Sequence, residues 1–274
     1  MAEKDIVFIT GANTGIGFEV VKALLQSPKA YHILLGSRSL EKGKEAISQL
    51  AEVLEGSSNT VELVEIDVTV DETINKAAEL VETKFGRLDA LVNNAGLTYD
   101  EGAAFDKLFT SDATDFRTLF NKSYDVNVSG AQVTTAAFAP LLIKSMNARL
   151  LFLTSGTANL TGHEQALIPA RAARVPKGWP KEGLIGGQAY KACKTALNMV
   201  MITWHWFLKD DGVKVWSISP GMLATNLTGN PELLRKAGAG EPSLGGDLIK
   251  RVLEGERDAD VARVVTQNGA VQPW

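Results

Sequence analysis

The sequence predicts an α/β fold in which helices cover both faces of a doubly wound parallel sheet. Short apolar runs of strand-forming residues alternate with longer segments of helical periodicity along most of the 274 residues. Right-handed crossovers between parallel strands place such helices on the two faces of one sheet. Apolar residues make up 45% of the chain and charged residues 22%, which is enough material for a buried core. We therefore expect residues 1–274 to form a single domain.

The first three expected strands alternate with two expected helices. Residues 6–9 form an apolar run that ends at a glycine-rich turn, and the next segment places Phe18, Val21 and Leu25 at helical spacing. A second apolar run at 32–35 precedes a charged helical stretch at 40–54, and a third strand is expected at 61–66. This order is the β-α-β-α-β unit of a parallel sheet.

Three further strands and two irregular segments complete the expected fold. Helical periodicity at 74–85 leads to a fourth strand at 90–92, and two long helical segments separate it from a fifth at 150–153; a sixth is expected at 213–218. Segments 156–189 and 225–246 are rich in proline and glycine, which excludes one continuous helix in either. Because both lie between elements of the same sheet, we expect loops over the carboxyl ends of its strands, where ligands bind.

A glycine-rich turn joins the first expected strand to its helix. It reads Thr10-Gly11-Ala12-Asn13-Thr14-Gly15-Ile16-Gly17. Glycines let a backbone turn tightly and approach a pyrophosphate, whose charge the free amides and the helix dipole stabilise. The alternative is an ordinary strand–helix turn, which would need one glycine rather than three. We therefore predict a dinucleotide site at this turn.

The turn resembles the TGxxxGxG turn of short-chain dehydrogenases/reductases, and other motifs of that family follow in the family's order. Asn93-Asn94-Ala95-Gly96 resembles its NNAG motif, and Tyr190 and Lys194 resemble its Tyr-x-x-x-Lys pair. The resemblance implies a Rossmann fold and a nicotinamide cofactor. The catalytic residues that it implies are Asn127, Ser155, Tyr190 and Lys194. The cofactor contacts that it implies are Gly11, Asn13, Thr14, Gly15, Ile16, Gly17, Asp67, Val68, Asn94, Ala95, Gly96, Tyr190, Lys194, Pro220, Gly221 and Thr225.

The charge that follows the second expected strand favours NADP(H) over NAD(H). An acidic residue about 20 positions after the glycines binds the ribose 2′-OH of NAD, whereas an arginine accommodates the 2′-phosphate of NADP. Here Ser37 stands at that place, Arg38 follows it, and Lys42 lies one helical turn further. Arg38 could instead be a solvated surface cation. We expect Arg38 and Lys42 to bind the 2′-phosphate.

The expected chemistry is reduction of an aldehyde or ketone by hydride transfer from NADPH. Tyr190 and Lys194 are four residues apart on an expected helix and so share one face. The lysine cation favours the tyrosine phenolate, which makes Tyr190 a feasible proton donor, and Ser155 would orient the carbonyl. The resemblance gives Asn127 a water-positioning role. A catalytically weak NADP(H)-binding or sensing protein, or an NAD-linked alcohol dehydrogenase, are the alternatives.

The long segment before Tyr190 resembles the insertion of the carbonyl-reductase branch of the family. In that branch the insertion packs beside the helices that other members use for association. We therefore expect a monomer, with 156–189 as an insertion that forms one wall of the pocket for a carbonyl or alcohol substrate, and with 225–246 as a substrate loop. A disordered surface excursion is the alternative for 156–189.

Composition excludes several other classes of protein. The formal net charge of −4 gives no basic field for nucleic acid. A single cysteine, Cys193, excludes an intramolecular disulfide and a multi-cysteine zinc site, and the three histidines are too scattered for a metal motif. The first ten residues lack the long apolar core of a signal peptide or membrane span. We expect a cytoplasmic protein with no metal and no membrane or nucleic-acid partner.

Overall fold

One twisted sheet organises the computed structural model, which describes residues 4–99, 113–165, 177–178 and 187–274. Eight strands of this described part follow the order β3-β2-β1-β4-β5-β6-β7-β8. All neighbouring strands are parallel except β7 and β8, which pair antiparallel. The strands are β1 Asp5–Ile9, β2 Tyr31–Ser37, β3 Thr60–Glu65, β4 Ala90–Asn93, β5 Arg149–Leu153, β6 Lys214–Ser219, β7 Val264–Thr266 and β8 Val271–Gln272.

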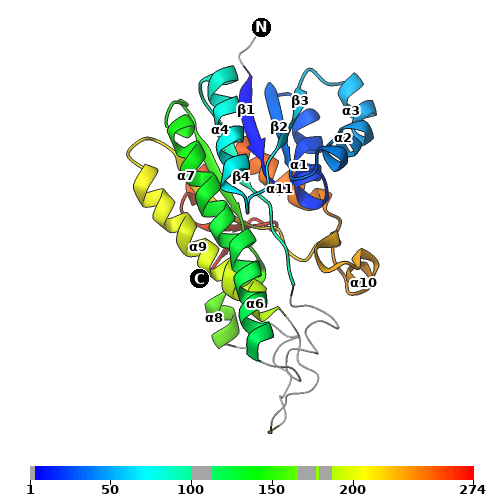
Figure 1. Cartoon of the computed structure of the whole chain (residues 1–274), viewed down its shortest axis with the longest axis vertical. Helices are drawn as coiled ribbons and strands as arrows, with labels where there is room; N and C mark the ends of the chain where they lie inside the picture. The colour runs from blue at the N-terminus through cyan, green and yellow to red at the C-terminus, as the bar shows by residue number, and fades with distance from the viewer. Residues whose placement is uncertain (1–3, 100–112, 166–176, 179–186) are drawn as a thin grey trace.

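Helices cover both faces of this sheet. The α-helices are α1 Gly15–Leu25, α2 Leu40–Gln49, α3 Ala51–Glu55, α4 Asp71–Phe85, α6 Ala113–Tyr124, α7 Gly130–Leu142, α8 Leu160–Glu164, α9 Gln188–Leu208, α10 Pro231–Lys236 and α11 Ser243–Leu253. Shorter turns are the π-helix η1 Asp125–Ser129 and the 3₁₀ helices η2 Gly156–Ala158, η4 Asn226–Thr228 and η5 Asp258–Asp260. Figure 1 shows α4, α7 and α9 on one face and α1 and α11 on the other.

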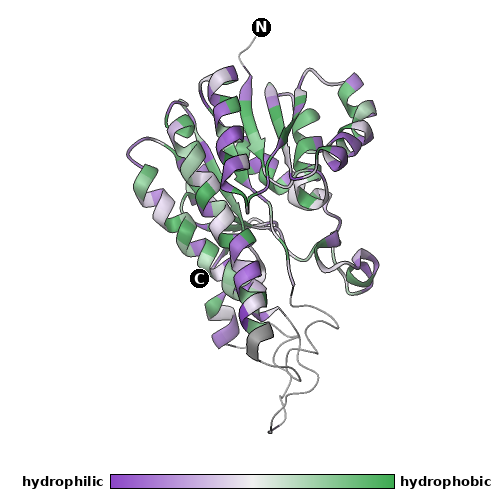
Figure 2. Ribbon diagram, viewed as in Figure 1, coloured by the Kyte–Doolittle hydropathy of each residue, from purple (hydrophilic) through white to green (hydrophobic). Residues whose placement is uncertain are grey.

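Alternation along each strand divides the core into two layers. Successive side chains of a strand point to opposite faces, so Phe8 enters the layer under α4, α7 and α9, whereas Ile9 enters the layer under α1 and α11. Phe8 packs against Phe138 of α7 with ring centroids 4.8 Å apart. Figure 2 shows apolar residues concentrated in the strands and polar residues on the outer faces of helices such as α2 and α4. Burial on both faces is what a parallel sheet requires.

The doubly wound order places a switch point between β1 and β4. β1 pairs with β2 on one side and with β4 on the other. From β1 the chain continues toward the β3 edge of the sheet, and from β4 it continues toward the opposite edge. Ligands of open α/β sheets bind at the carboxyl ends of the strands beside such a point. The fold predicted from the sequence, a single-domain α/β Rossmann-like fold, is confirmed, and each of its six predicted strands is present.

The structure differs from the predicted elements at three places. The stretch 40–54 is two helices rather than one, because the chain turns at Leu50, whose side chain is completely buried. Strands β7 and β8 were not predicted, since three and two residues are too short for a periodic signal. Segment 225–246 is not only loop, since it contains η4, α10 and the start of α11.

The two irregular segments both contain short helices. In 225–246, Thr225 and Asn230 cap η4 and α10, and Arg235 forms ion pairs with Glu232 and Glu241. In 156–189, the described part begins with η2 and α8 and ends with the first turn of α9. The prolines that marked this segment lie outside the described residues.

Candidate active site

Thr10 and Asn94 join the glycine turn to the end of β4. The Thr10 hydroxyl accepts hydrogen bonds from the backbone amides of Asn94 and Ala95, both at 3.0 Å. The Asn94 side-chain amide donates to the carbonyl oxygens of Thr10, at 2.8 Å, and Gly11, at 3.1 Å. The predicted NNAG motif therefore supports the predicted glycine turn directly across the switch point.

Close packing explains two of the glycines in the turn. A Cβ atom on Gly17 would lie 2.5 Å from the Asn94 Nδ2 atom and 2.8 Å from the Gly11 carbonyl oxygen, which no side chain tolerates. Gly11 has a φ of +62°, a left-handed conformation, and a Cβ there would lie 3.0 Å from the Ala95 Cα atom. Only glycine fits at either position.

The start of α1 is arranged for an anion. Thr14 precedes the helix in an extended conformation, its side chain caps no amide, and the first turn contains no acidic residue. The first amides of a helix have no partner within the helix, and the helix dipole adds a partial positive charge there. A pyrophosphate therefore fits this turn. The side chain of Ile16 instead packs toward α11, since a Cβ on Gly245 would lie 3.0 Å from it.

Arg38 and Lys42 follow β2, which is bonded to the glycine turn. The Ala12 amide donates to the Gly36 carbonyl oxygen at 2.8 Å, so the ends of β1 and β2 lie together. Ser39 then starts α2 by accepting a hydrogen bond from the Lys42 amide. The side chains of Arg38 and Lys42 are exposed, and neither forms an ion pair with any described residue.

Asp67 and Val68 shape the turn after β3. The Asp67 carboxylate accepts hydrogen bonds from the amide of Thr69, at 2.9 Å, and from its hydroxyl, at 2.7 Å. Val68 packs tightly against α7, because a Cβ on Gly130 would lie 2.6 Å from the Val68 carbonyl oxygen. Both residues thus have a structural role in addition to the cofactor contact expected from the sequence.

Lys194 on α9 is buried against the end of β5. Its amine donates to the Leu153 carbonyl oxygen at 2.8 Å, and its own carbonyl oxygen accepts from the Thr154 hydroxyl at 3.2 Å. The side chain is almost completely buried, and this burial lowers the pKa of the amine to about 8. The amine lies 5.5 Å from the centroid of the Tyr190 ring. Lys194 is therefore held against the two residues that directly precede Ser155.

Ser155 begins the short helix η2. Its hydroxyl oxygen accepts a hydrogen bond from the Thr157 amide at 3.2 Å and lies 3.1 Å from the Thr157 hydroxyl oxygen. The side chain is half-buried. Its capping role fixes the position of the hydroxyl.

Asn127 lies in the π-helix η1, a rare local conformation that is common at functional sites. Its side chain accepts from the Leu97 amide at 3.2 Å and donates to the Leu97 and Ser123 carbonyl oxygens at 2.9 and 2.8 Å. Asn127 and Lys194 also approach each other, because a Cβ on Gly96 would lie 2.9 Å from Asn127 Oδ1 and 3.2 Å from Lys194 Nζ.

The structure brings Thr225 to the glycine turn from β6. Pro220 and Gly221 follow that strand, and Gly221 has a φ of +85°. A Cβ on Gly15 would lie 3.7 Å from the Cβ and Cγ2 atoms of Thr225. The Thr225 hydroxyl caps η4 by accepting from the Leu227 amide. Residues from the ends of β1, β4, β5 and β6 thus meet at one edge of the sheet.

Some residues of this site were not predicted from the sequence. Thr10 ends the first predicted strand, but its hydroxyl was given no role, although it organises the NNAG segment. Thr157 and Leu97 were also missed, because their contacts join segments that no motif links. A threonine directly before a glycine-rich turn is the signal that could have identified Thr10.

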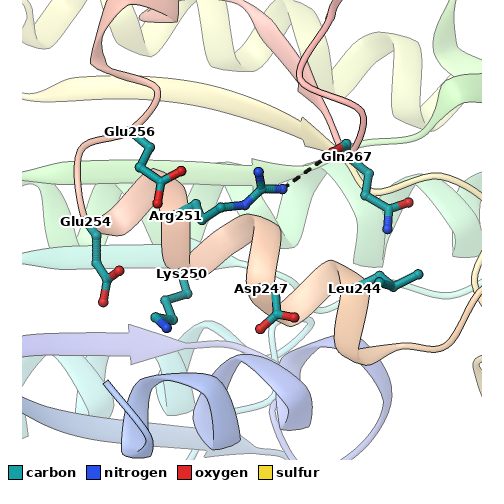
Figure 3. Close-up of a pocket in the computed structure, with 7 residues that line it drawn as sticks. All are labelled: Leu244, Asp247, Lys250, Arg251, Glu254, Glu256 and Gln267. Atoms are coloured by element: carbon teal, nitrogen blue, oxygen red, sulfur yellow. Dashed lines mark hydrogen bonds between the residues drawn. The ribbon is translucent and has the colours of Figure 1, made fainter. Parts of the chain in front are cut away.

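Features outside this edge of the sheet do not add to the candidate site. No group of three or more His, Cys, Asp and Glu side chains within the described ranges could hold a metal ion. None of the helices in the described part is both long and apolar enough to cross a membrane. A cavity of about 460 Å³ lies along α11. Figure 3 shows its lining, which carries charges of both signs and includes none of the predicted catalytic residues.

The doubly wound sheet, with its glycine turn and NNAG segment joined at the switch point between β1 and β4, defines a protein of the Rossmann type. Residues 5–167 match the sequence model of the family described as short chain dehydrogenase. The chain belongs to the short-chain dehydrogenase/reductase family, and its class is that of an oxidoreductase acting on a small molecule.

Two fungal relatives match the chain along its whole length. The short-chain dehydrogenase/reductase tropE of Talaromyces stipitatus is 42% identical over 281 residues, covering 100% of this chain and 99% of the relative. The short-chain dehydrogenase/reductase eupG of a Phoma species is 39% identical over 281 residues, covering 99% and 98%.

Solved structures share the fold at low sequence identity. The NADPH-bound carbonyl reductase from chicken fatty liver has a TM-score of 0.75 at 20% identity and covers 100% of both chains. The carbonyl reductase Sniffer of D. melanogaster has a TM-score of 0.73 at 21% identity, covering 99% of this chain and 100% of that one.

Proposed function

We propose that this protein is an NADPH-dependent reductase that transfers hydride to the carbonyl of an aldehyde or ketone. The observation that carries the proposal is the buried amine of Lys194, which joins α9 to the end of β5, two residues before Ser155, and lies 5.5 Å from the centroid of the Tyr190 ring. A buried amine with a lowered pKa at the carboxyl edge of a parallel sheet is costly, and such groups are concentrated at functional sites. The opposite reaction, alcohol oxidation, uses the same groups.

The cofactor would be held by the glycine turn and by the residues around it. The first turn of α1 would bind the pyrophosphate, and the exposed cations Arg38 and Lys42 would bind the 2′-phosphate. Asn13, Pro220 and Thr225 complete the proposed contacts. The absence of an ion pair at Arg38 within the described residues supports this assignment, because the guanidinium has no competing carboxylate there.

The protein's own groups would complete the chemistry once hydride arrives. Bound NADPH would supply the hydride. The Tyr190 hydroxyl would donate its proton to the substrate oxygen, and the nearby Lys194 cation would stabilise the phenolate left behind. The Ser155 hydroxyl would donate a hydrogen bond to the same substrate oxygen, which strengthens as negative charge develops there.

Asn127 would act in this mechanism by holding neighbouring groups in place. Both polar atoms of its side-chain amide are engaged by the Leu97 and Ser123 backbone, so the side chain holds the segment after Gly96 in place. A Cβ on Gly96 would lie 2.9 Å from Asn127 Oδ1 and 3.2 Å from Lys194 Nζ, so any larger residue at this position would crowd both groups. We assign Asn127 the role of positioning a water that resupplies protons to Tyr190 through Lys194.

A spectrophotometric assay tests the proposed function. The purified protein would be given NADPH or NADH with a panel of aldehydes, ketones and quinones, and loss of the reduced cofactor would be followed by absorbance. Turnover with NADPH well above that with NADH supports the proposal. Turnover with NADH alone points to an NAD-linked dehydrogenase, and tight NADPH binding without turnover on any carbonyl or alcohol points to a sensing protein.

The proposal extends to a cytoplasmic monomer whose insertion lines the substrate pocket. The insertion 156–189 lies largely outside the described residues, so it is tested by function: deletion around 169–177 should change KM or substrate range.

Helix α9 exposes Met199, Trp206 and Phe207, the kind of apolar surface that self-association covers. Sedimentation at several protein concentrations therefore measures the oligomeric state, and a stable dimer would contradict the proposed monomer.

A further inference from the structure

Strand β8 brings Gln272 against the segment that carries Ser155. β8 pairs antiparallel with β7 at the edge of the sheet, where Gln272 stands opposite Val264. The Gln272 side chain is buried, with 9% of its surface exposed, whereas Val271 points outward with 42% exposed. A buried glutamine on a two-residue edge strand is unusual, because long polar side chains are rarely buried without a partner.

The partner of Gln272 is the main chain of Ser155. The Gln272 Nε2 atom donates to the Ser155 carbonyl oxygen at 3.3 Å, and the Ala158 amide donates to the same oxygen at 3.0 Å. The Gln272 Oε1 atom lies 3.8 Å from where a Cβ of Gly156 would be, so the amide group lies along the turn. Gln272 therefore holds the peptide group that joins Ser155 to Gly156.

A second bond attaches the same end of the chain to the far side of this segment. The Thr161 amide in α8 donates to the main-chain oxygen of Trp274 at 2.8 Å. Residues 272–274 thus contact the serine segment at its start and again after η2. On the other side, Lys194 and Thr154 join α9 to the strand directly before Ser155.

The serine segment needs such support because of its sequence. Glycine has no side chain to restrict its backbone, so the peptide group between Ser155 and Gly156 has more freedom than one between two larger residues. Rotation of that peptide group would displace the Thr157 amide from the Ser155 hydroxyl to which it donates. A hydrogen bond to the Ser155 carbonyl oxygen opposes this rotation.

We propose that Gln272 is a positioning residue that orients Ser155 for hydrogen bonding to the substrate carbonyl. This inference rests on the proposed function, since it needs Ser155 to contact the substrate. Gln272 itself touches no reacting atom and acts through the Ser155 backbone. Of the two residues of β8, only Gln272 has this positioning role, since Val271 points outward.

Kinetics of matched variants test the proposal. Gln272→Met keeps the length and volume of the side chain and removes the hydrogen bond, and Val271→Thr, on the opposite face of β8, is the control. A net hydrogen bond of ordinary strength predicts a fall in kcat of about three- to ten-fold for Gln272→Met. KM for NADPH should stay unchanged, because Gln272 contacts none of the proposed cofactor residues. Val271→Thr should behave like the wild type.

A double-mutant cycle separates positioning from general damage to the fold. In a Ser155→Ala background, Gln272→Met should cause no further loss of the residual kcat, because its effect passes through the Ser155 hydroxyl. Losses that multiply, or an equal loss in Val271→Thr, would overturn the proposal.

Amide hydrogen exchange gives a readout that does not need turnover. The Thr157 and Ala158 amides, which bond to the Ser155 hydroxyl and carbonyl oxygens, should exchange at least three-fold faster in Gln272→Met than in the wild type or Val271→Thr. Unchanged exchange would overturn the positioning role even in an active enzyme. If the wild type reduces no carbonyl, the proposed function fails, and faster exchange would still show that Gln272 restrains Ser155.

Discussion

The amine of Lys194 donates a 2.8 Å hydrogen bond to the carbonyl oxygen of Leu153, two residues before Ser155. This contact anchors the first third of α9 to the carboxyl end of β5. Tyr190 lies one helical turn earlier on the same face of α9, with its ring centroid 5.5 Å from the Lys194 amine. The contact with Leu153 buries the amine away from water, which disfavours its charged form and lowers the pKa of Lys194 to about 8.

The lowered pKa of Lys194 predicts a pH-dependent difference in stability. Below pH 8 the amine is charged in both the folded and the unfolded protein. As the pH rises above 8, the folded protein loses the proton first, so the unfolded state binds more protons and the wild type gains stability relative to Lys194→Met. Between pH 7 and pH 9 this relative gain should be about 1 kcal/mol, measured by denaturant unfolding. A constant difference across that range would contradict the lowered pKa.

Close packing at Gly17 predicts that an added methyl group disrupts the cofactor site. Gly17→Ala would bring a Cβ to 2.5 Å from the Asn94 amide nitrogen, so the NNAG segment must shift. We expect NADPH affinity to fall by at least about ten-fold, with a destabilisation of about 1–3 kcal/mol. Gly56→Ala is the control, because Gly56 has open space around it and an ordinary backbone conformation. Isothermal titration and thermal unfolding check both effects.

The proposed contact of Arg38 with the 2′-phosphate predicts a preference for NADPH over NADH that depends on this residue. Arg38→Asp removes a charge-assisted contact with the 2′-phosphate and adds repulsion. KM for NADPH should rise about ten- to one-hundred-fold, and activity with NADH should improve. Lys44→Asp makes the same change of charge on an exposed part of α2 and should leave the preference as it is. Steady-state kinetics with both cofactors measure this, and an unchanged NADPH preference in Arg38→Asp would reject the assignment.

The sequence predicted the parts of the fold and site that depend on local pattern. Parallel strands buried on both faces are apolar runs, so all six predicted strands are found, and the glycines at 11 and 17 are demanded by backbone conformation or close packing. The motif residues Asn127, Lys194 and Thr225 lie at the predicted edge of the sheet.

Contacts between distant segments could not be read from local pattern. The turn at Leu50 depends on burial under the sheet, and the π-helix around Asn127 depends on the bonds of its side chain to the Leu97 backbone. The same holds for Gln272, whose partner Ser155 is far away in the sequence. No periodicity or motif connects such pairs, so only the folded chain reveals them.

The measurement that tests the central claim most directly is single-turnover reduction by Tyr190→Phe. Phenylalanine keeps the ring beside Lys194 and removes only the hydroxyl that would donate the proton. NADPH should bind to the variant with wild-type affinity, measured by fluorescence titration, while reduction of the best carbonyl substrate falls about 10²- to 10⁴-fold. Reduction at near the wild-type rate by this variant, with the same substrate, would contradict the assignment of Tyr190 as the proton donor.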